Sequence, residues 1–360
     1  MSKAPYGNDP AKIERYKAFW SRADAKRPLV GFSLIGWFPF DEFAACKSWG
    51  SSPYLTPEMI EPAAFMEDHL RILREGEAVD DDVLRGVAPT HVAVPFLPGV
   101  LGCKVRILPD NAMGEEQNLS WEEALQVRLD TRHPWFRKYV EFAQAMVARS
   151  QGQFPVSHAA DLGPTDLHAV LRGHSQSILD LTDEPGKSAE LLAKLGDIFC
   201  EYTREYWKTL PLFHGGYFDG QYSLWAPGPI IRMQEDATAV YSPNLYRKLV
   251  QPVDRKMAGS FASSFIHLHS SSMFLLDAFL EIDEIRCFEI NIDVCGPPVK
   301  VMAGYFQKVQ KARRPLLVRG SLRPDDLDLL MDCLEPRGLF LNIMVNSMTE
   351  IANLRPRLGM

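Results

Sequence analysis

Short apolar runs alternate with amphipathic segments along most of this chain. Runs such as PLLVRG and GLFLNIMV are continuously apolar for the length of one strand. Strands buried on both faces have this composition, which is typical of a parallel sheet covered by helices. The pattern predicts helices at 135–150, 166–171, 184–209, 242–263, 274–280, 299–311 and 324–333, and strands at 154–160, 214–219, 264–269, 287–292, 316–319 and 338–345.

The N-terminal part begins in the same way and then becomes irregular. Apolar residues at helical spacing predict a helix over 10–23, and LVGFSL predicts a buried strand over 29–34. The segment from Trp37 to Tyr54 is rich in aromatic and turn-forming residues. Such a segment suits a lid over a pocket, and a loop packed on the outside of the fold is an equal alternative.

About eight strand–helix units fit into the chain, and no glycine-rich GxGxxG loop follows the first strand. The fold we expect is therefore α/β, a closed (β/α)8 TIM barrel. We expect residues 1–360 to form one domain, with residues 1–90 contributing lid elements.

Composition excludes several classes of protein. The 360 residues carry a formal net charge of −7 without a basic block, which argues against a nucleic-acid partner. No uncharged apolar run reaches the length of a membrane span, and the polar start has no signal peptide. The six cysteines are scattered without CxxC pairs, as in a reduced protein. We expect a cytoplasmic protein without membrane or nucleic-acid partners, and monomer and homodimer both stay open.

Polar residues follow the predicted strands, where barrel enzymes carry their chemistry. His267 and His269 are two residues apart on one strand, so both imidazoles share a face. They are candidate zinc ligands with Glu289 of the next strand, since zinc takes imidazole and carboxylate ligands. An acid–base role, or a hydrogen-bonded core position for one imidazole, are the alternatives.

Further site candidates come from neighbouring strands. Glu289 and Asn291 alternate with apolar residues, and a carboxylate inside a barrel is costly unless it is paired or functional. Asp219 ends another predicted strand and, with His267 and Glu289, is a candidate catalytic residue. The pair Glu235–Asp236 is interpreted as the cap of a short helix. Candidate substrate-binding residues are Trp37, Phe38, Tyr217, Gln221, Trp225 and Asn291.

Four segments resemble the uroporphyrinogen decarboxylase superfamily: MQEDATAVYSPNLYRKLVQP, FIHLHSSS, FEINIDVCGPP and RRPLLVRGSL. That superfamily includes the decarboxylase of haem synthesis and the methyltransferases that serve corrinoid proteins. The resemblance covers most of the chain and is strongest from about Gly215 to the C-terminus. It implies the same (β/α)8 barrel.

The sequence departs from both branches of that superfamily. The decarboxylase grips its substrate with an arginine-rich segment after the first strand, where this chain has GFSLIGWFPFDEF without arginine. The methyltransferases hold zinc with a His-x-Cys pair and a further cysteine near the last strand. Here the pair is His267-Leu268-His269, and the later stretch, Met344-Val345-Asn346, has no thiol. The resemblance therefore implies a metal held by the two histidines and a carboxylate such as Glu289, or no metal.

Three hypotheses follow. The first is a corrinoid-dependent methyltransferase acting on a small, weakly charged methyl donor, with zinc as cofactor and the corrinoid on a partner protein. The second is a metal-independent decarboxylase or lyase of a small carboxylic acid, with His267 or Asp219 as the acid. The third is a barrel that binds a ligand or a corrinoid protein without catalysis.

Overall fold

A six-stranded parallel sheet forms the centre of the molecule, in the order β1-β11-β10-β9-β8-β7. The structure, a computed structural model, describes residues 4–34, 39–49, 52–89 and 95–360. Neighbouring strands pair in register, with Val30 opposite Leu341 and Val318 opposite both Leu341 and Ile290. The strands are β1 (Leu29–Ser33), β7 (Ile230–Gln234), β8 (Ser263–Leu268), β9 (Cys287–Ile292), β10 (Leu316–Gly320) and β11 (Leu339–Met344).

Two extended segments continue the sheet beyond β1. The amide of Asp82 donates to the carbonyl oxygen of Val30 at 3.0 Å, and Val87 forms a parallel bridge with Val156. The fold is therefore α/β with a predominantly parallel sheet, as the alternation of apolar runs predicts. Six strands of this sheet are paired in the described residues, and its closure into an eight-stranded barrel stays a prediction.

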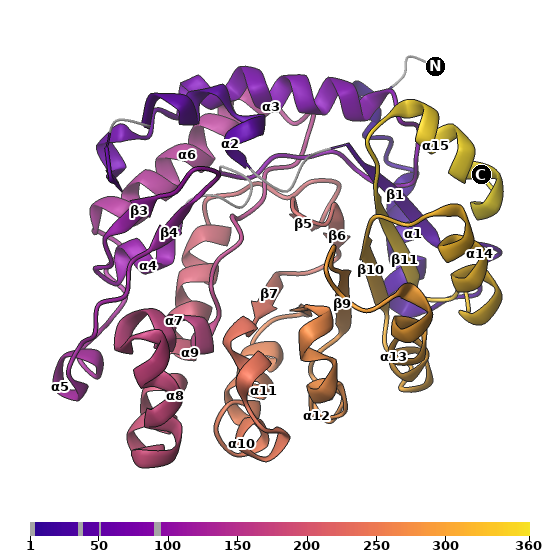
Figure 1. Cartoon of the computed structure of the whole chain (residues 1–360). Helices are drawn as coiled ribbons and strands as arrows, with labels where there is room; N and C mark the ends of the chain where they lie inside the picture. Colours follow the sequence, from indigo (N-terminus) through magenta and orange to yellow (C-terminus); the bar gives the residue numbers. More distant parts are fainter. Residues whose placement is uncertain (1–3, 35–38, 50–51, 90–94) are drawn as a thin grey trace.

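Helices lie around the outer side of the sheet (Figure 1). Their apolar faces pack on strands that are apolar on both sides, so the core is continuous. The predicted bounds of β9, α13 and α14 are confirmed residue for residue. The α-helices are α1 (Lys12–Ser21), α2 (Pro39–Glu42), α3 (Pro62–Glu77), α4 (Phe96–Val100), α5 (Trp121–Ala124), α6 (Pro134–Ser150), α7 (Pro164–Arg172), α8 (His174–Asp183), α9 (Pro185–Trp207), α10 (Pro243–Leu249), α11 (Gln251–Gly259), α12 (Leu276–Leu280), α13 (Val299–Lys311), α14 (Pro324–Cys333) and α15 (Met348–Leu354).

One predicted strand forms in part but lies outside the parallel sheet. Within 214–219, residues Tyr217–Asp219 form β5, which pairs antiparallel with β6 (Leu224–Ala226) in a hairpin. The parallel position is taken by β7 instead. The chain reverses because the Tyr222 amide donates to the Asp219 carboxylate at 3.0 Å and Ser223 adopts a left-handed φ of 51°.

The single helix predicted over 242–263 is also wrong. It is divided into α10 and α11, because Pro252 lies in the first turn of α11 and has no amide hydrogen to continue the ladder of α10. The start of α10 agrees with the sequence, since the Ser242 side chain caps the Leu245 amide and Pro243 follows.

The N-terminal third adds a second, small sheet. Its order is β2-β3-β4, with β2 (Tyr54–Leu55), β3 (Val105–Ile107) and β4 (Ala112–Gly114). Helix α3, which the sequence pattern did not predict, packs against α6. Trp37 and Phe38 lie outside the described residues, so their predicted place in a lid stays a prediction.

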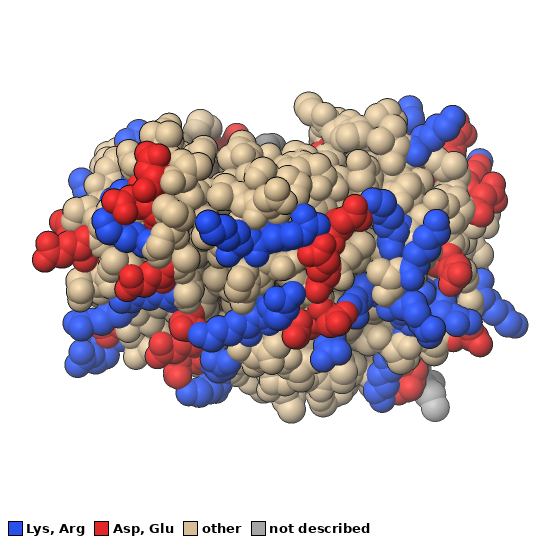
Figure 2. Space-filling model, turned by 90° about the horizontal axis from the view of Figure 1, so that it is seen from below, with Lys and Arg blue, Asp and Glu red and all other residues tan. Residues whose placement is uncertain are grey.

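The outer surface gives two further observations. On the face shown in Figure 2, positive and negative side chains are interspersed. Of the helices in the described ranges, none has the length and apolar character that crossing a membrane requires.

Candidate functional site

Two imidazoles face each other at the C-terminal end of β8. His267 is buried near the end of the strand, and His269 is half-buried at the N-cap of the short 3-10 helix Ser270–Leu275. Their Nε2 atoms are 3.2 Å apart, and their ring centroids are 4.6 Å apart. The i, i+2 spacing on the strand places both rings on one side, as the sequence predicts.

The opposite nitrogen of each imidazole is held by a carboxylate. His267 Nδ1 contacts Glu289 Oε2 and lies 2.8 Å from the Tyr222 hydroxyl. His269 Nδ1 lies 2.7 Å from Asp293 Oδ1, and the other oxygen of Asp293 accepts hydrogen bonds from Ser270. A carboxylate on Nδ1 fixes the tautomer that leaves Nε2 free to bind a ligand.

A third candidate ligand atom comes from Asp236, two residues after the end of β7. Its Oδ2 lies 3.8 Å from His269 Nε2, and one ligand atom from each of Asp236, His267 and His269 lies within 4.8 Å of the others. Gln234 Nε2 donates to the same Oδ2 at 2.5 Å, while Asp166 accepts from the backbone amides of Asp236 and Ala237. Gln234 thus holds the carboxylate, and Asp166 holds the backbone that carries it.

Burial and charge decide where the protons lie. Desolvation, with Arg232 nearby, lowers the pKa of His267 well below its ordinary value. Desolvation also raises the pKa of Glu289 to about 8, although Arg319 and Arg232 oppose it. The hydrogen bond with Asp293 raises the pKa of His269. Two Nε2 lone pairs 3.2 Å apart repel each other unless a cation lies between them. Without a metal ion, a proton on His269 is the cation that the protein itself can supply.

The residues present fit a divalent metal ion. Two imidazole nitrogens and one carboxylate oxygen are the donor set of many catalytic zinc sites, which leave a fourth position open. Positive charge at Nε2 also stabilises the ionised form of the buried Glu289. This carboxylate lies on the far side of the His267 ring, so the arrangement differs from the predicted one. Glu289 orients an imidazole, and Asp236 is the carboxylate beside both Nε2 atoms.

Tyr222 fills the space inside the curved sheet next to His267. The tip of the β5–β6 hairpin carries it there, and its ring lies between Arg232 and Arg319, whose Cζ atoms are 5.7 and 5.6 Å from the ring centroid. Asn342 of β11 donates to the Tyr222 carbonyl oxygen at 2.9 Å. The interior is therefore polar and filled by the protein itself.

Other predicted site residues lie away from the imidazole pair. Asp219 lies 3.3 Å from His158 Nε2 and holds the hairpin turn. Burial alone raises its pKa, but hydrogen bonding and charge from His158 and Arg232 bring it below its ordinary value. The Trp225 ring packs near Tyr16 of α1 at the other end of the sheet. These contacts are consistent with a structural role for the hairpin.

The remaining predicted residues are divided between the interior and the hairpin. Asn291 is buried on β9, and its Oδ1 has no hydrogen-bond partner among the described residues. Gln221 is half-buried and lines a cavity of about 50 Å³ with Asn342. Tyr217 packs edge-on against Trp207 at 4.9 Å between ring centroids. Their substrate-binding roles stay predictions.

A larger cavity opens beside Asp236. It has a volume of about 400 Å³, and Ala112, Met113 and Gly114 of β4 form one wall. Asp161 and Asp166 also line it, and burial raises their pKa to about 6 and about 8. No lysine or arginine is among the described residues that line it. Among the described residues, β4 of the small sheet thus forms a wall of this cavity.

Sequence reasoning missed Asp236 and both interior arginines. Asp236 looked like a helix cap because it does begin a 3-10 helix, Asp236–Val240. Arg232 and Arg319 interrupt the buried apolar strands IIRMQ and LLVRG. A charged residue within such a strand is costly to bury, so this interruption was the signal that could have marked them.

Comparison with known proteins supports the fold. A methyltransferase from Methanosarcina mazei superposes with a TM-score of 0.64 over 97% of this chain and 98% of that chain, at 11% sequence identity. A second structure, from Silicibacter pomeroyi and assigned as a glycerophosphoryl diester phosphodiesterase, reaches only 0.37 over 96% of this chain and 98% of that chain, at 9% identity, and carries no argument. No family model matches the sequence, and no curated protein is significantly similar to it. The chain has a methyltransferase-like fold.

Proposed function

We propose that this protein is a metal-dependent methyltransferase of the corrinoid type, acting on a small, weakly charged methyl donor. The observation that carries the proposal is the convergence of Asp236, His267 and His269 beside a cavity of about 400 Å³. The superposition with a methyltransferase is consistent with it at the level of the fold.

The proposal includes a closed barrel. The segments around 82–88 and 154–158 would be its second and third strands, since Val87 accepts from the Ser157 amide at 2.8 Å and donates to the Pro155 carbonyl oxygen at 3.0 Å. Strand β7 would then be the fourth. In this arrangement His267, His269 and Asp236 all lie at the C-terminal end of the barrel, where enzymes of this fold carry their site.

Asp236, His267 and His269 would hold the metal, with zinc the best match to two imidazoles and a carboxylate. A bound zinc ion supplies Lewis acidity to the heteroatom from which the methyl group departs. The site offers no thiolate, so the centre is harder than the Cys-containing one that the family resemblance implies, and oxygen or nitrogen donors suit it better than thiols.

The chain's own residues position the donor. The cavity beside Asp236 is lined by alanine, leucine, valine and proline together with carboxyls whose pKa values are raised, so a donor with several negative charges is disfavoured there. Methyl transfer leaves the bonding electron pair on the heteroatom, which needs a proton or a Lewis acid. The acceptor in the proposal is the corrinoid of a partner protein that docks at this end.

Metal content of purified variants tests the proposal. His269→Ala is preferred over His267→Ala, because His267 is buried with three side-chain partners and its loss would also cost stability. Wild-type protein should bind about one zinc ion per chain, and His269→Ala should lose it while keeping its circular dichroism spectrum. His214→Asn is the matched control, an exposed histidine at a left-handed φ that asparagine accepts. Equal zinc in all three proteins would overturn the metal site.

A lyase acting on a carboxylic acid is the alternative, and the buried Arg232 and Arg319 are the observation in its favour. A guanidinium pair could bind a carboxylate. However, the cavity that reaches Arg232 from Asp161 measures only about 10 Å³, which admits no substrate. Activity that persists after complete zinc removal would favour the lyase over the methyltransferase.

A further inference from the structure

A second, larger cavity lies at the opposite end of the sheet. Its volume is about 720 Å³, and it is bounded by the N-terminal ends of β8, β9, β10 and β11 together with the C-terminal ends of α1 and α13. Ser263, which lines it, begins the strand whose far end carries His267. The cavity is therefore separated from the candidate metal site by the length of β8.

Positive charge dominates the lining. The cationic residues are Arg22, Arg286, Lys311, Arg313, Arg314 and Arg337, and the one carboxylate among the described lining residues is Glu335. A concentration of cations in one cavity is unusual in a chain whose net charge is −7. It needs counter-charge either from the protein or from a ligand.

The protein supplies only part of that counter-charge. Arg314 pairs with Asp283 at 2.5 Å, Arg22 lies 3.8 Å from Glu335, and Arg337 pairs with Asp24. Among the described residues, no carboxylate lies within ion-pair distance of Arg286, Lys311 or Arg313. Among the residues that the structure describes, the buried Nε of Arg314 also has no hydrogen-bond partner. Donors thus remain available on this surface.

The central arginine is fixed in place. Arg22 adopts a left-handed φ of 51° after α1 and donates to the carbonyl oxygens of Gln310 and Arg314 at 3.2 and 3.1 Å. A Cβ at Gly338 would come within 2.6 Å of its Cγ, so the glycine permits the close approach. Burial lowers the pKa of Arg22, with Glu335 opposing the shift and Arg313 and Arg337 adding to it.

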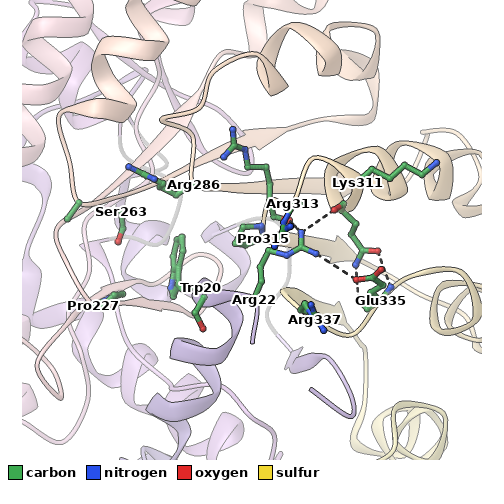
Figure 3. A pocket seen from close by; sticks show the side chains of 14 residues that line it. Trp20, Arg22, Pro227, Ser263, Arg286, Lys311, Arg313, Pro315, Glu335 and Arg337 are labelled. Carbon is green, nitrogen blue, oxygen red and sulfur yellow. Dashed lines mark hydrogen bonds and ion pairs between the residues drawn. The ribbon is translucent and has the colours of Figure 1, made fainter. Parts of the chain in front are cut away.

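An aromatic ring lies among these cations. Trp20 is half-buried, and its Nε1 donates to the Trp225 carbonyl oxygen at 2.7 Å, which fixes the orientation of the ring. Figure 3 shows Trp20 between Arg22 and Arg286 in the cavity. Guanidinium groups bind phosphate oxygens in pairs, and an indole face stacks on a planar ring.

We propose that this cavity binds a small organic polyphosphate that carries a planar ring, such as a nucleoside polyphosphate. The volume lies within the range of roughly 300–1,000 Å³ that is typical of small-molecule sites. The phosphates would contact Arg286 and Arg313 at the rim and Arg22 and Arg314 deeper in, and the ring would stack on Trp20. The proposal is independent of the metal site.

Calorimetric titration of the full chain at low salt tests it, with ATP, inorganic tripolyphosphate and adenosine as probes. ATP should bind more tightly than tripolyphosphate by about fivefold or more, the value of one stacked ring, and adenosine should show no measurable binding. The double variant Arg286→Gln/Arg313→Asn should weaken ATP binding about 30-fold or more, because two charge-assisted contacts are lost. Neither residue pairs with a carboxylate of the described ranges, and asparagine accepts the φ of 58° at position 313.

Two controls make the outcome decisive. Arg128→Gln/Lys300→Gln removes the same net charge from exposed positions elsewhere and should leave the affinity unchanged. Trp20→Leu should reduce ATP binding to the level of tripolyphosphate. Unchanged ATP affinity in the Arg286→Gln/Arg313→Asn variant would overturn the site. Heat that arises from chelation at Asp236, His267 and His269 would persist in that variant and therefore counts against the site. Binding of polyglutamate instead of either phosphate probe would also overturn it, in favour of an acidic peptide.

Discussion

The two ends of strand β8 carry opposite chemistry. At its C-terminal end the side chains are imidazoles and carboxylates, and each imidazole has a carboxyl group on its Nδ1 atom. At its N-terminal end the side chains are arginines, of which Arg286 and Arg313 face no carboxylate among the described residues. Side chains that are held rigidly in pairs suit metal binding and catalysis. Cations without partners suit the reversible binding of an anion.

Removing the ligand carboxylate should have the largest effect on this contrast. Asp236→Ala removes one of the three proposed metal ligands, whereas Glu289→Gln replaces only the group that orients His267. Loss of an outer partner weakens metal binding by roughly 10–100-fold, and we expect Asp236→Ala to exceed about 100-fold. Competition with a chromogenic chelator measures both constants. A weaker effect for Asp236→Ala than for Glu289→Gln would reverse the roles assigned here.

The buried carboxyls of the same end should make stability depend on pH. Desolvation raises the pKa of Asp254 from 3.8 to about 7, and Glu235, with which it shares a hydrogen bond, is also raised. The native state therefore holds protons that the unfolded chain releases between about pH 4 and 7. The free energy of unfolding should fall by about 1–3 kcal/mol as pH rises through this window.

Urea unfolding of Asp254→Asn at several pH values checks this origin. The variant cannot ionise, so its stability should change less with pH than that of the wild type. The amide can still accept the hydrogen bond that Tyr246 donates to Asp254 at 2.6 Å. An unchanged slope in the variant would place the pH dependence elsewhere.

A smaller effect is expected for Tyr222→Phe. The substitution keeps the ring between the two arginines and removes only the hydroxyl that lies 2.8 Å from His267 Nδ1. A lost buried hydrogen bond costs about 1–2 kcal/mol. Chemical denaturation should show this loss, with zinc content unchanged, because Glu289 still holds the imidazole. A variant without zinc would show that the hydroxyl is needed for the site itself.

The smallest change in stability is expected at the other end. Arg286→Gln/Arg313→Asn removes two exposed charges that have no carboxylate partner among the described residues, so unfolding free energy should change by no more than about 0.5 kcal/mol. The relief of repulsion from neighbouring arginines favours a slight gain. A loss well beyond this value would show that the two side chains support the fold.

The secondary structure in the C-terminal half could be read from the sequence because it depends on local patterns. β9, α13 and α14 each combine a clear period with a proline or a turn at the boundary. The β5–β6 hairpin could not, since the strand with which β5 pairs is decided by tertiary contacts. Arg232 interrupts the apolar pattern of β7. A sequence pattern alone places an arginine at the surface, and its burial is seen only in the folded chain.

The candidate site was predicted in part for the same reason. The spacing of His267 and His269 is local, so their convergence follows from strand geometry alone. Which carboxylate meets which nitrogen depends on how β7, β8 and β9 align. Glu289 lies directly opposite His267 in the register and therefore reaches Nδ1, while Asp236 arrives from beyond the end of β7. No spacing within the sequence encodes that alignment.

The β5–β6 hairpin also sets the order in which the chain can fold. Its backbone is held by Tyr16, 207 residues before Ser223, by Trp20, 205 residues before Trp225, and by Asn342, 120 residues after Tyr222. Contacts between residues so far apart in the sequence form slowly, because a long loop must lose conformational entropy before the contact stabilises it. The contact between the hairpin and β11 can therefore form only after β11 has been synthesised, and we expect the imidazole pair that Tyr222 supports to be completed late in folding.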